Sequence, residues 1–217
     1  MSVLTLATSK GGTGKTTIAM VLAARLAAEA RVVVLDADPT EAFTRWARDA
    51  YEGPPFETIP ETDETRLAHL IAAKAEAAGL VVVDTAGFGN RAATVAMTSA
   101  DAVLVPSLSA EADVTEAEKT IRLVEGLARA ARRDIPARVV LNRVRRTALA
   151  RHAAREIEGA ELPSLTTSLS DLVAFGELSY AGRLPAAGTA RTEIEALIAE
   201  LRAAEFIPTS GHQYVTS

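Results

Sequence analysis

A glycine-rich segment near the start of the chain carries the residues best suited to bind a phosphate. Residues 9–17 read Ser-Lys-Gly-Gly-Thr-Gly-Lys-Thr-Thr, after an apolar run typical of a strand and before a pattern typical of a helix. Glycines let the backbone aim several N–H groups inward, and a helix N-terminus adds partial positive charge. Lys15 is placed to reach the β- and γ-phosphates of a nucleotide, and the Thr16 hydroxyl to ligate Mg²⁺. We therefore predict a phosphate loop made of Lys10, Gly11, Gly12, Thr13, Gly14, Lys15, Thr16 and Thr17.

This loop departs by one position from the usual template G-x-x-x-x-G-K-[ST]. Ser9 stands where the template has its first glycine, and an additional lysine, Lys10, follows it. The chain has only four lysines against 19 arginines, and two of the four lie in this loop. A compact ammonium suits a phosphate oxygen better than a planar guanidinium does, so we expect both lysines to serve phosphates.

Carboxylates at the ends of two later apolar runs are candidates for metal binding and hydrolysis. Asp36 and Asp38 follow residues 32–35, and alternate side chains at a strand end point the same way. Asp84 follows the aliphatic run 80–83, as in a Walker B strand. We expect Thr16, Asp36 and Asp84 to hold Mg²⁺ and its waters, and Asp38 to position the attacking water. Without the phosphate loop, the Asp36 and Asp38 pair would indicate a helix cap and a turn.

The elements that must position these residues follow from alternating apolar patterns. Short β-branched runs predict strands at residues 3–8, 32–35, 80–83, 102–105 and 139–141. Longer periodic segments predict helices at residues 16–30, 66–78, 91–100, 114–132 and 148–158. Such units build a mainly parallel, twisted sheet with helices on both faces, which binds ligands outside the carboxyl ends of its strands. We predict one α/β domain over residues 1–207, a surface connection at 51–55 and a disordered tail at 208–217.

Composition excludes several classes of protein. The chain has 217 residues, a net charge of −5 and no cysteine, which rules out thiolate metal sites, a cysteine nucleophile and cysteine-bound clusters. No apolar run approaches the roughly 20 residues of a membrane span. A terminal helix with Ile194, Leu197, Ile198 and Leu201 on one face is also predicted. Its polar positions include Glu193, Glu195 and Glu200, which anionic lipid would repel. We therefore expect a cytoplasmic protein that does not bind membranes.

The segment K-G-G-T-G-K-T-T at residues 10–17 resembles that of the deviant Walker A cytoskeletal ATPases, the group that contains the ParA partition proteins and the MinD cell-division ATPases. The motif D-x-D-P at residues 36–39 agrees, although Thr40 and Ala86 replace the usual glutamine and proline. The resemblance implies a P-loop NTPase that binds ATP and Mg²⁺, hydrolyses ATP slowly and forms an ATP-dependent homodimer. In such a dimer Lys10 reaches the partner's phosphates, Lys15 holds its own nucleotide and Asp38 serves hydrolysis.

The same resemblance assigns the side of the site that holds the base. It implies that the Asn142 amide reads the adenine edge, the alternative being a simple cap of the turn after the last predicted strand. Residues 166–171 resemble the final strand and the purine-side loop of the family, but no clear motif identifies a residue that stacks on the base.

Arginines gathered late in the sequence are candidates for nucleic-acid binding. By resemblance, the ATP-bound dimer would bind nonspecific DNA, associate with the nucleoid, and position a plasmid, a chromosome or another cargo with a ParB-like protein or another adaptor. Ion-paired, solvated helix faces are the alternative for the arginines. A metabolic ATP-dependent synthetase or kinase of the same fold, or a MinD-like positioning ATPase, are the alternatives for the function. The DNA-binding candidates are Arg132, Arg133, Arg143, Arg145, Arg146 and Arg151.

Overall fold

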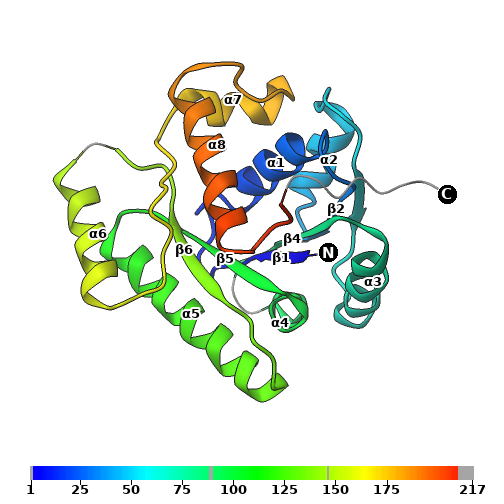
Figure 1. Cartoon of the computed structure of the whole chain (residues 1–217), viewed down its shortest axis with the longest axis horizontal. Helices are drawn as coiled ribbons and strands as arrows, with labels where there is room; N and C mark the ends of the chain where they lie inside the picture. The colour runs from blue at the N-terminus through cyan, green and yellow to red at the C-terminus, as the bar shows by residue number, and fades with distance from the viewer. Residues whose placement is uncertain (1, 88–89, 146, 210–217) are drawn as a thin grey trace.

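Six parallel strands form a twisted sheet at the centre of the chain (Figure 1). The computed structural model describes residues 2–87, 90–145 and 147–209. Along the sheet the strands lie in the order β3-β2-β4-β1-β5-β6. The strands are β1 (Ser2–Leu6), β2 (Val32–Ala37), β3 (Glu57–Pro60), β4 (Leu80–Thr85), β5 (Ala102–Ser107) and β6 (Ala137–Leu141).

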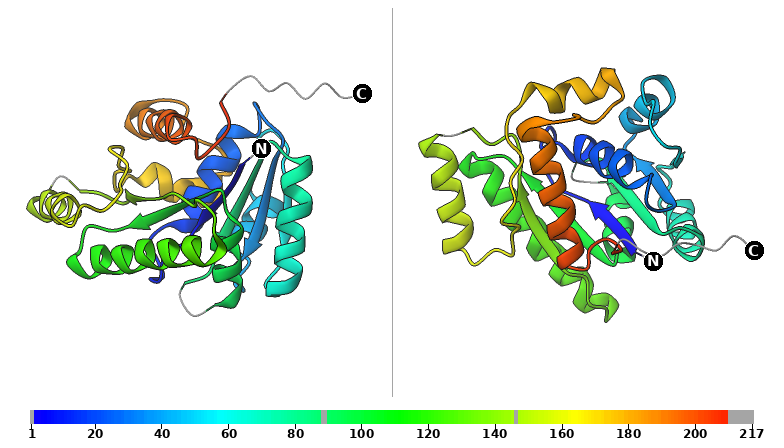
Figure 2. Two further views of the ribbon diagram at one scale, coloured as in Figure 1. Left: turned by 60° about the horizontal axis from the view of Figure 1, so that its bottom comes forward. Right: turned by 45° about the horizontal axis from the view of Figure 1, so that its top comes forward.

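Helices cover both faces of this sheet (Figure 2). Helices α1, α2, α7 and α8 pack on one face, and α3, α4, α5 and α6 belong to the apolar clusters of the other face. The predicted single-domain α/β fold is therefore confirmed. The helices are α1 (Lys15–Leu26), α2 (Ala42–Asp49), α3 (Glu64–Ala77), α4 (Arg91–Ser99), α5 (Glu111–Ala131), α6 (Ala148–Gly159), α7 (Val173–Ala181) and α8 (Gly188–Ala203).

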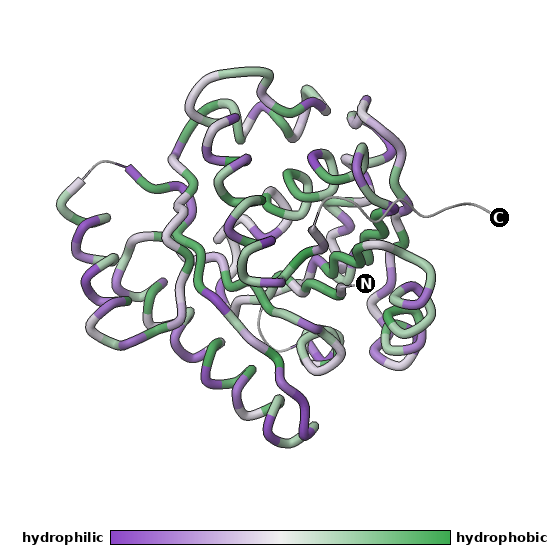
Figure 3. Tube along the Cα trace, in the orientation of Figure 1, coloured by the Kyte–Doolittle hydropathy of each residue, from purple (hydrophilic) through white to green (hydrophobic). Residues whose placement is uncertain are grey.

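The central strands are apolar because both of their faces are covered. Every residue of β2, β4 and β5 is buried, and the hydropathy colouring of the trace shows the apolar centre and the polar outer helix faces (Figure 3). Ile194, Leu197, Ile198 and Leu201 of α8 are buried against the sheet. Packing against the sheet therefore accounts for the apolar face of α8. Among the described residues, no helix is long and apolar enough to cross a membrane.

Three elements were missing from the sequence prediction. Strand β3, at the edge of the sheet, has three partly exposed residues and the exposed Pro60, so it lacks the apolar run of a central strand. Helix α2 has only two buried residues, Phe43 and Trp46, and is preceded by Glu41 in the left-handed conformation. Helix α7 buries only Leu178. The Gly-Pro-Pro segment joins α2 to β3 at the surface, as predicted.

The segment expected to form a last strand is not a strand of the sheet. Isolated bridges join Ser164 to Val139 and Ser170 to Val144. Single backbone hydrogen bonds also run from Leu169 to Leu141 and from Asp171 to Val144, without forming a strand. The carboxylates of α8 explain the difference. Glu200 accepts the backbone N–H groups of Thr166 and Thr167, and Glu193 accepts that of Ser170, so side chains satisfy donors that a neighbouring strand would otherwise bind. Of the predicted tail, residues 210–217 lie outside the described part of the chain, as does Arg146.

Candidate nucleotide site

The phosphate loop joins β1 to α1 at the carboxyl edge of the sheet. Gly12 and Gly14 have φ values of +79° and +96°, a region that residues with side chains rarely enter. A Cβ atom on Gly14 would also overlap the side-chain amide of Asn142. Helix α1 begins directly after Gly14, so the N–H groups of its first turn remain available for an anion.

Lys15 lies at the base of this loop. The residue is only 7% exposed, and its ammonium donates to the carbonyl oxygen of Lys10 over 3.3 Å. Burial lowers the pKa of Lys15, against the opposing attraction of Asp84 and Asp38. A buried ammonium with a single neutral acceptor has donors left for a further negatively charged group.

Asp84 and Asp36 are brought together by strand register. The two residues are paired across β4 and β2, and β1 lies on the other side of β4. Both Asp84 oxygens are buried and lack a hydrogen-bond partner in the described chain. Burial raises the pKa of Asp84 to about 7, an effect that the nearby Thr16 hydroxyl opposes. A buried carboxylate without a donor, next to a threonine hydroxyl, fits the hydrated Mg²⁺ of a nucleotide.

Asp36 makes three hydrogen bonds inside the protein. One oxygen accepts the backbone N–H and the hydroxyl of Thr44, over 2.9 and 2.8 Å, and the other accepts the backbone N–H of Asp38 over 3.3 Å. Burial raises the pKa of Asp36, and the bonds from Thr44 and Asp38 oppose that rise. Asp36 therefore fixes the start of α2 and the backbone of Asp38, and its metal role stays a prediction.

One pocket of about 610 Å³ contains most of the predicted nucleotide ligands. Gly11, Gly12, Gly14, Lys15, Thr16 and Thr17 line it from the phosphate loop, and Asp38 from the end of β2. The arrangement places a carboxylate that can orient water opposite the groups that can hold a triphosphate. The described residues hold no group of three or more histidines or acids that would bind a metal unaided.

Asn142 lines the same pocket, but both ends of its amide are occupied. The amide nitrogen donates to the carbonyl oxygen of Thr13 over 2.8 Å, and the amide oxygen accepts the backbone N–H of Arg143 over 2.9 Å. These bonds attach β6 to the phosphate loop. Reading of adenine by Asn142 stays a prediction.

The structure adds lining residues that sequence reasoning did not find. Leu172, Val173, Phe175 and Gly176, at the start of α7, line the pocket together with Ser170 and Asp171. The apolar side chains of Leu172, Val173 and Phe175 suit the faces of a purine. The sequence of this short helix contains no motif that would have identified these residues. They reach the pocket because the chain before α7 runs alongside β6.

Lys10 is turned away from this pocket. Its ammonium lies 2.6 Å from a carboxylate oxygen of Asp113 in α5 of the same subunit. The described chain therefore places Lys15, Thr16, Asp38 and Asn142 around one pocket and holds Lys10 beside it.

The candidate DNA-binding arginines fall into two groups at opposite ends of β6. Arg132 and Arg133 precede β6, and Arg133 bonds to Thr98 and Asp101. Arg143 and Arg145 follow β6 at the nucleotide pocket, where both pair with Asp171. The exposed Arg151 lies in the first turns of α6, near the second group. The predicted arginines thus form two groups. Arg143, Arg145 and Arg151 lie at the edge of the sheet that carries the phosphate loop, and Arg132 and Arg133 lie at the other edge.

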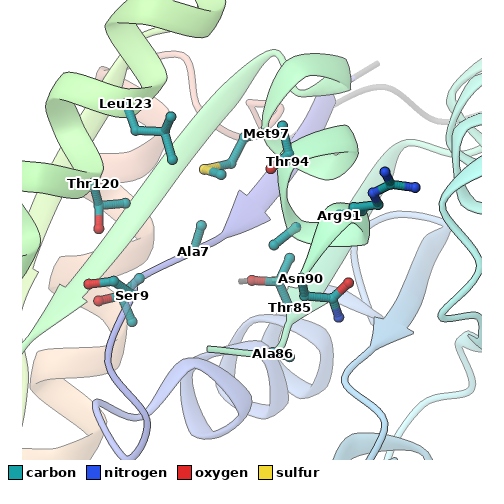
Figure 4. A pocket seen from close by; sticks show the side chains of 12 residues that line it. Ala7, Ser9, Thr85, Ala86, Asn90, Arg91, Thr94, Met97, Thr120 and Leu123 are labelled. Atoms are coloured by element: carbon teal, nitrogen blue, oxygen red, sulfur yellow. The ribbon is translucent and has the colours of Figure 1, made fainter. Parts of the chain in front are cut away.

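A second cavity, of about 250 Å³, lies on the opposite face of the sheet between α4 and α5 (Figure 4). Met97, Leu123 and Ala7 give it an apolar wall, and Ser9 and Ala86 connect it to the loops after β1 and β4. None of the predicted phosphate or metal ligands lines it.

Comparison with known proteins agrees with this fold. The family model described as VirC1 protein matches residues 1–203. A VirC1 protein of Rhizobium radiobacter is 30% identical over 193 residues, which cover 85% of this chain and 83% of the relative. A ParA protein of the same organism is 31% identical over 145 residues, covering 66% and 65%. The maintenance of carboxysome distribution protein A of Halothiobacillus neapolitanus is 33% identical over 172 residues, covering 76% and 78%.

Solved structures share the architecture. An ATP complex of a McdA variant from Cyanothece has a TM-score of 0.77 at 15% identity, covering 97% of this chain and 99% of that one, a likeness that concerns the fold alone. Fold and site together define a ParA/MinD-type member of the deviant Walker A ATPases. Within that class, the chain belongs to the VirC1 family.

Proposed function

We propose that this protein is an ATPase that dimerises with ATP, binds nonspecific DNA in that state and positions a cargo. Hydrolysis, slow in the protein alone and stimulated by a ParB-like protein or another adaptor, would dissolve the dimer and release the DNA. The observation that carries the proposal is the pocket that joins the phosphate loop to Asp38, beside the unpartnered Asp84 carboxylate. Family membership supports the ATPase reaction, because the relatives include ParA and a carboxysome distribution protein.

Each part of the pocket has a task in this reaction. The phosphate loop and Lys15 would bind the triphosphate, and Thr16 and Asp84 would hold Mg²⁺, which supplies charge neutralisation on the phosphates. Asp38 would orient water, its carboxylate being fixed by the Thr40 N–H over 2.8 Å and its backbone by Asp36. The apolar start of α7 would cover the base.

Binding to DNA is the least supported part of the proposal, and a direct test is sedimentation with duplex DNA. The purified protein is mixed with DNA and ATP, ADP or no nucleotide, at low and raised salt. We expect retention only with ATP, and retention that falls steeply as salt increases, because arginine contacts to phosphates release counterions. Equal retention in all three nucleotide states would contradict the proposal.

The location of the DNA surface is tested in the same assay. We expect Arg145→Glu with Arg151→Glu to abolish retention, because these arginines lie near the edge where two subunits would meet. Arg132→Glu serves as the matched control at the opposite end of β6. Loss of retention only in Arg132→Glu would contradict this location and indicate that DNA binds at the opposite end of β6.

Phosphoryl transfer to a metabolite is the competing function. A screen of candidate acceptors without DNA distinguishes it, since an ATPase of the proposed kind releases inorganic phosphate whatever metabolite is present.

A further inference from the structure

The hydroxyl of Thr44 is one of the donors that hold the Asp36 carboxylate. Thr44 lies in the first turn of α2, and its backbone N–H and its hydroxyl donate to the same oxygen of Asp36, over 2.9 and 2.8 Å. Glu41, the residue before this helix, makes no side-chain cap. Asp36 therefore caps α2 from the end of β2, and the Thr44 hydroxyl fixes the carboxylate that does so.

The surroundings of Asp36 make such a hold necessary. Asp36 is fully buried, and strand register places it beside Asp84, a second fully buried carboxylate. Two carboxylates on neighbouring strands repel each other when both are charged. If the Thr44 hydroxyl were absent, Asp36 would keep only backbone donors, and its carboxylate would be less firmly oriented.

The other oxygen of Asp36 transmits this orientation to Asp38. It accepts the backbone N–H of Asp38 over 3.3 Å, a long bond that depends on how the Asp36 carboxylate is turned. The Asp38 carboxylate in turn accepts the N–H of Thr40 over 2.8 Å, and the Asp38 carbonyl oxygen accepts that of Glu41 over 2.8 Å. The loop that carries Asp38 to the nucleotide pocket is thus attached to Asp36 where it begins and to α2 where it ends.

We propose that Thr44 is a positioning residue for hydrolysis, and that its hydroxyl holds the Asp36 carboxylate in the orientation that places Asp38 against the attacking water. The inference rests on the proposed function, which assigns hydrolysis to Asp38. Thr44 does not line the nucleotide pocket. Its hydroxyl therefore acts on the reaction through Asp36 and Asp38, and it does not contact the nucleotide.

The substitution Thr44→Val tests this inference, because it keeps the branched shape and the backbone N–H of the residue and removes the hydroxyl. Steady-state ATP hydrolysis gives kcat and KM. We expect kcat to fall about tenfold with KM unchanged, consistent with the loss of one hydrogen bond to a charged group. Thr44→Ser keeps the hydroxyl and should restore most of kcat. An unchanged kcat in Thr44→Val, a change confined to KM, or an equal loss in both variants would overturn the inference.

The dependence on Mg²⁺ distinguishes this role from a role in metal binding. If the Thr44 hydroxyl oriented Asp36 for Mg²⁺, a high concentration of the metal would restore turnover in Thr44→Val. We expect the Mg²⁺ concentration for half-maximal turnover to be the same in the variant and in the unmodified protein, and the lower kcat to persist at saturating Mg²⁺. Recovery of kcat at saturating Mg²⁺ would overturn the inference.

A matched control lies on α8. Thr192 is exposed, and its hydroxyl donates to the Gly188 carbonyl oxygen of the same helix, away from the nucleotide pocket. Thr192→Val makes the same chemical change as Thr44→Val and should leave kcat unaltered. A fall of equal size in Thr192→Val would attribute the loss to a general effect of the substitution and overturn the role of Thr44.

A measurement without nucleotide separates this inference from the proposed function. Hydrogen–deuterium exchange followed by mass spectrometry reports the opening of the backbone over residues 36–45. We expect this segment to exchange several-fold faster in Thr44→Val than in the unmodified protein or in Thr44→Ser, because the N–H groups of Asp38 and Thr44 donate to the carboxylate that the hydroxyl holds. Equal exchange in all three proteins would overturn the inference. Absence of ATP hydrolysis in the unmodified protein would instead contradict the proposed function.

Discussion

At the scale of single residues, the carboxylates of the candidate site differ in their hydrogen bonding. The Asp84 oxygens make no hydrogen bond of good geometry among the described residues, with the Thr16 hydroxyl nearby, whereas Asp36 accepts three hydrogen bonds, from Thr44 and from the backbone of Asp38. Asp38 lines the pocket. The three acids share one edge of the sheet, but their surroundings differ because one faces α2 and the others face the phosphate loop.

The lysine of the phosphate loop gives the first prediction. Lys15→Ala removes the one buried ammonium of the pocket, so we expect ATP affinity to fall by about a hundredfold or more and ATP-dependent dimerisation to disappear. Titration of a fluorescent ATP analogue measures the affinity. Lys119→Ala, on the exposed face of α5, is the control and should bind normally. Unchanged affinity in Lys15→Ala would place the nucleotide elsewhere.

Asp38 gives the second prediction. Asp38→Ala removes the carboxylate that would orient water and leaves the phosphate loop intact, so we expect turnover to fall by about a hundredfold or more while ATP still supports a dimer. Phosphate release and sedimentation velocity with ATP measure the two properties. Unaltered turnover in the purified variant would contradict the catalytic role of Asp38.

At the scale of elements, α8 does more than cover the sheet. Glu193 and Glu200 bind the backbone of the segment that leads into the nucleotide pocket, and Glu195 binds Arg25 of α1. Two of the acidic residues that seemed to argue only against a membrane, Glu193 and Glu200, therefore hold the segment that precedes α7 in place. Their partners lie 23 to 170 positions away in the chain, beyond the reach of local pattern reasoning.

Loss of one of these carboxylates should weaken nucleotide binding from a distance. Glu193→Ala leaves the N–H and the hydroxyl of Ser170 without their acceptor, and Ser170 lines the pocket. We expect ATP affinity to fall about fivefold, consistent with hydrogen bonds to a charged group. Glu195→Ala, on the same helix but paired with Arg25, is the matched control. Equal losses in both variants would indicate general damage to α8.

The sequence predicts five of the six strands and the position of the glycine-rich loop, because these depend on local patterns. The runs before Asp36 and Asp84 are buried on both faces, so their composition alone indicates central strands. Helix α7 and strand β3 have few buried residues, and their place depends on neighbours rather than on their own periodicity. The pairing of Lys10 with Asp113 was missed for a related reason, since a salt bridge between distant positions leaves no spacing pattern.

At the scale of the whole molecule, an ion-pair network joins α1 to α8. Arg25 binds both Glu29 and Glu195, and Arg202 also binds Glu29. The hydrogen bond from Arg25 is the largest cause that lowers the pKa of Glu29, to about 2, from an ordinary value of 4.5. The network connects α1, the helix that follows the phosphate loop, with α8, the helix that holds the segment before α7.

This network predicts a pH dependence of stability. Because folding lowers the pKa of Glu29, its contribution is complete above about pH 4.5 and is lost as the pH falls toward 2. We expect Glu29→Gln to lower the free energy of unfolding by about 1 kcal/mol at pH 6, a value reduced for solvent screening, and the difference from the unmodified protein to shrink as the pH falls toward 2. Urea unfolding at several pH values measures it. A difference that stays constant across this range would contradict the assignment.

The one tryptophan of the chain, Trp46, gives the molecule an internal optical reporter. Its indole packs among Phe43, Tyr51 and Phe56, and its N–H donates to the Leu178 carbonyl of α7 over 2.8 Å. Since the first turn of that helix lines the nucleotide pocket, emission from this indole should change whenever the occupant of the pocket changes. Binding and release can thus be followed in real time in unlabelled, unmodified protein.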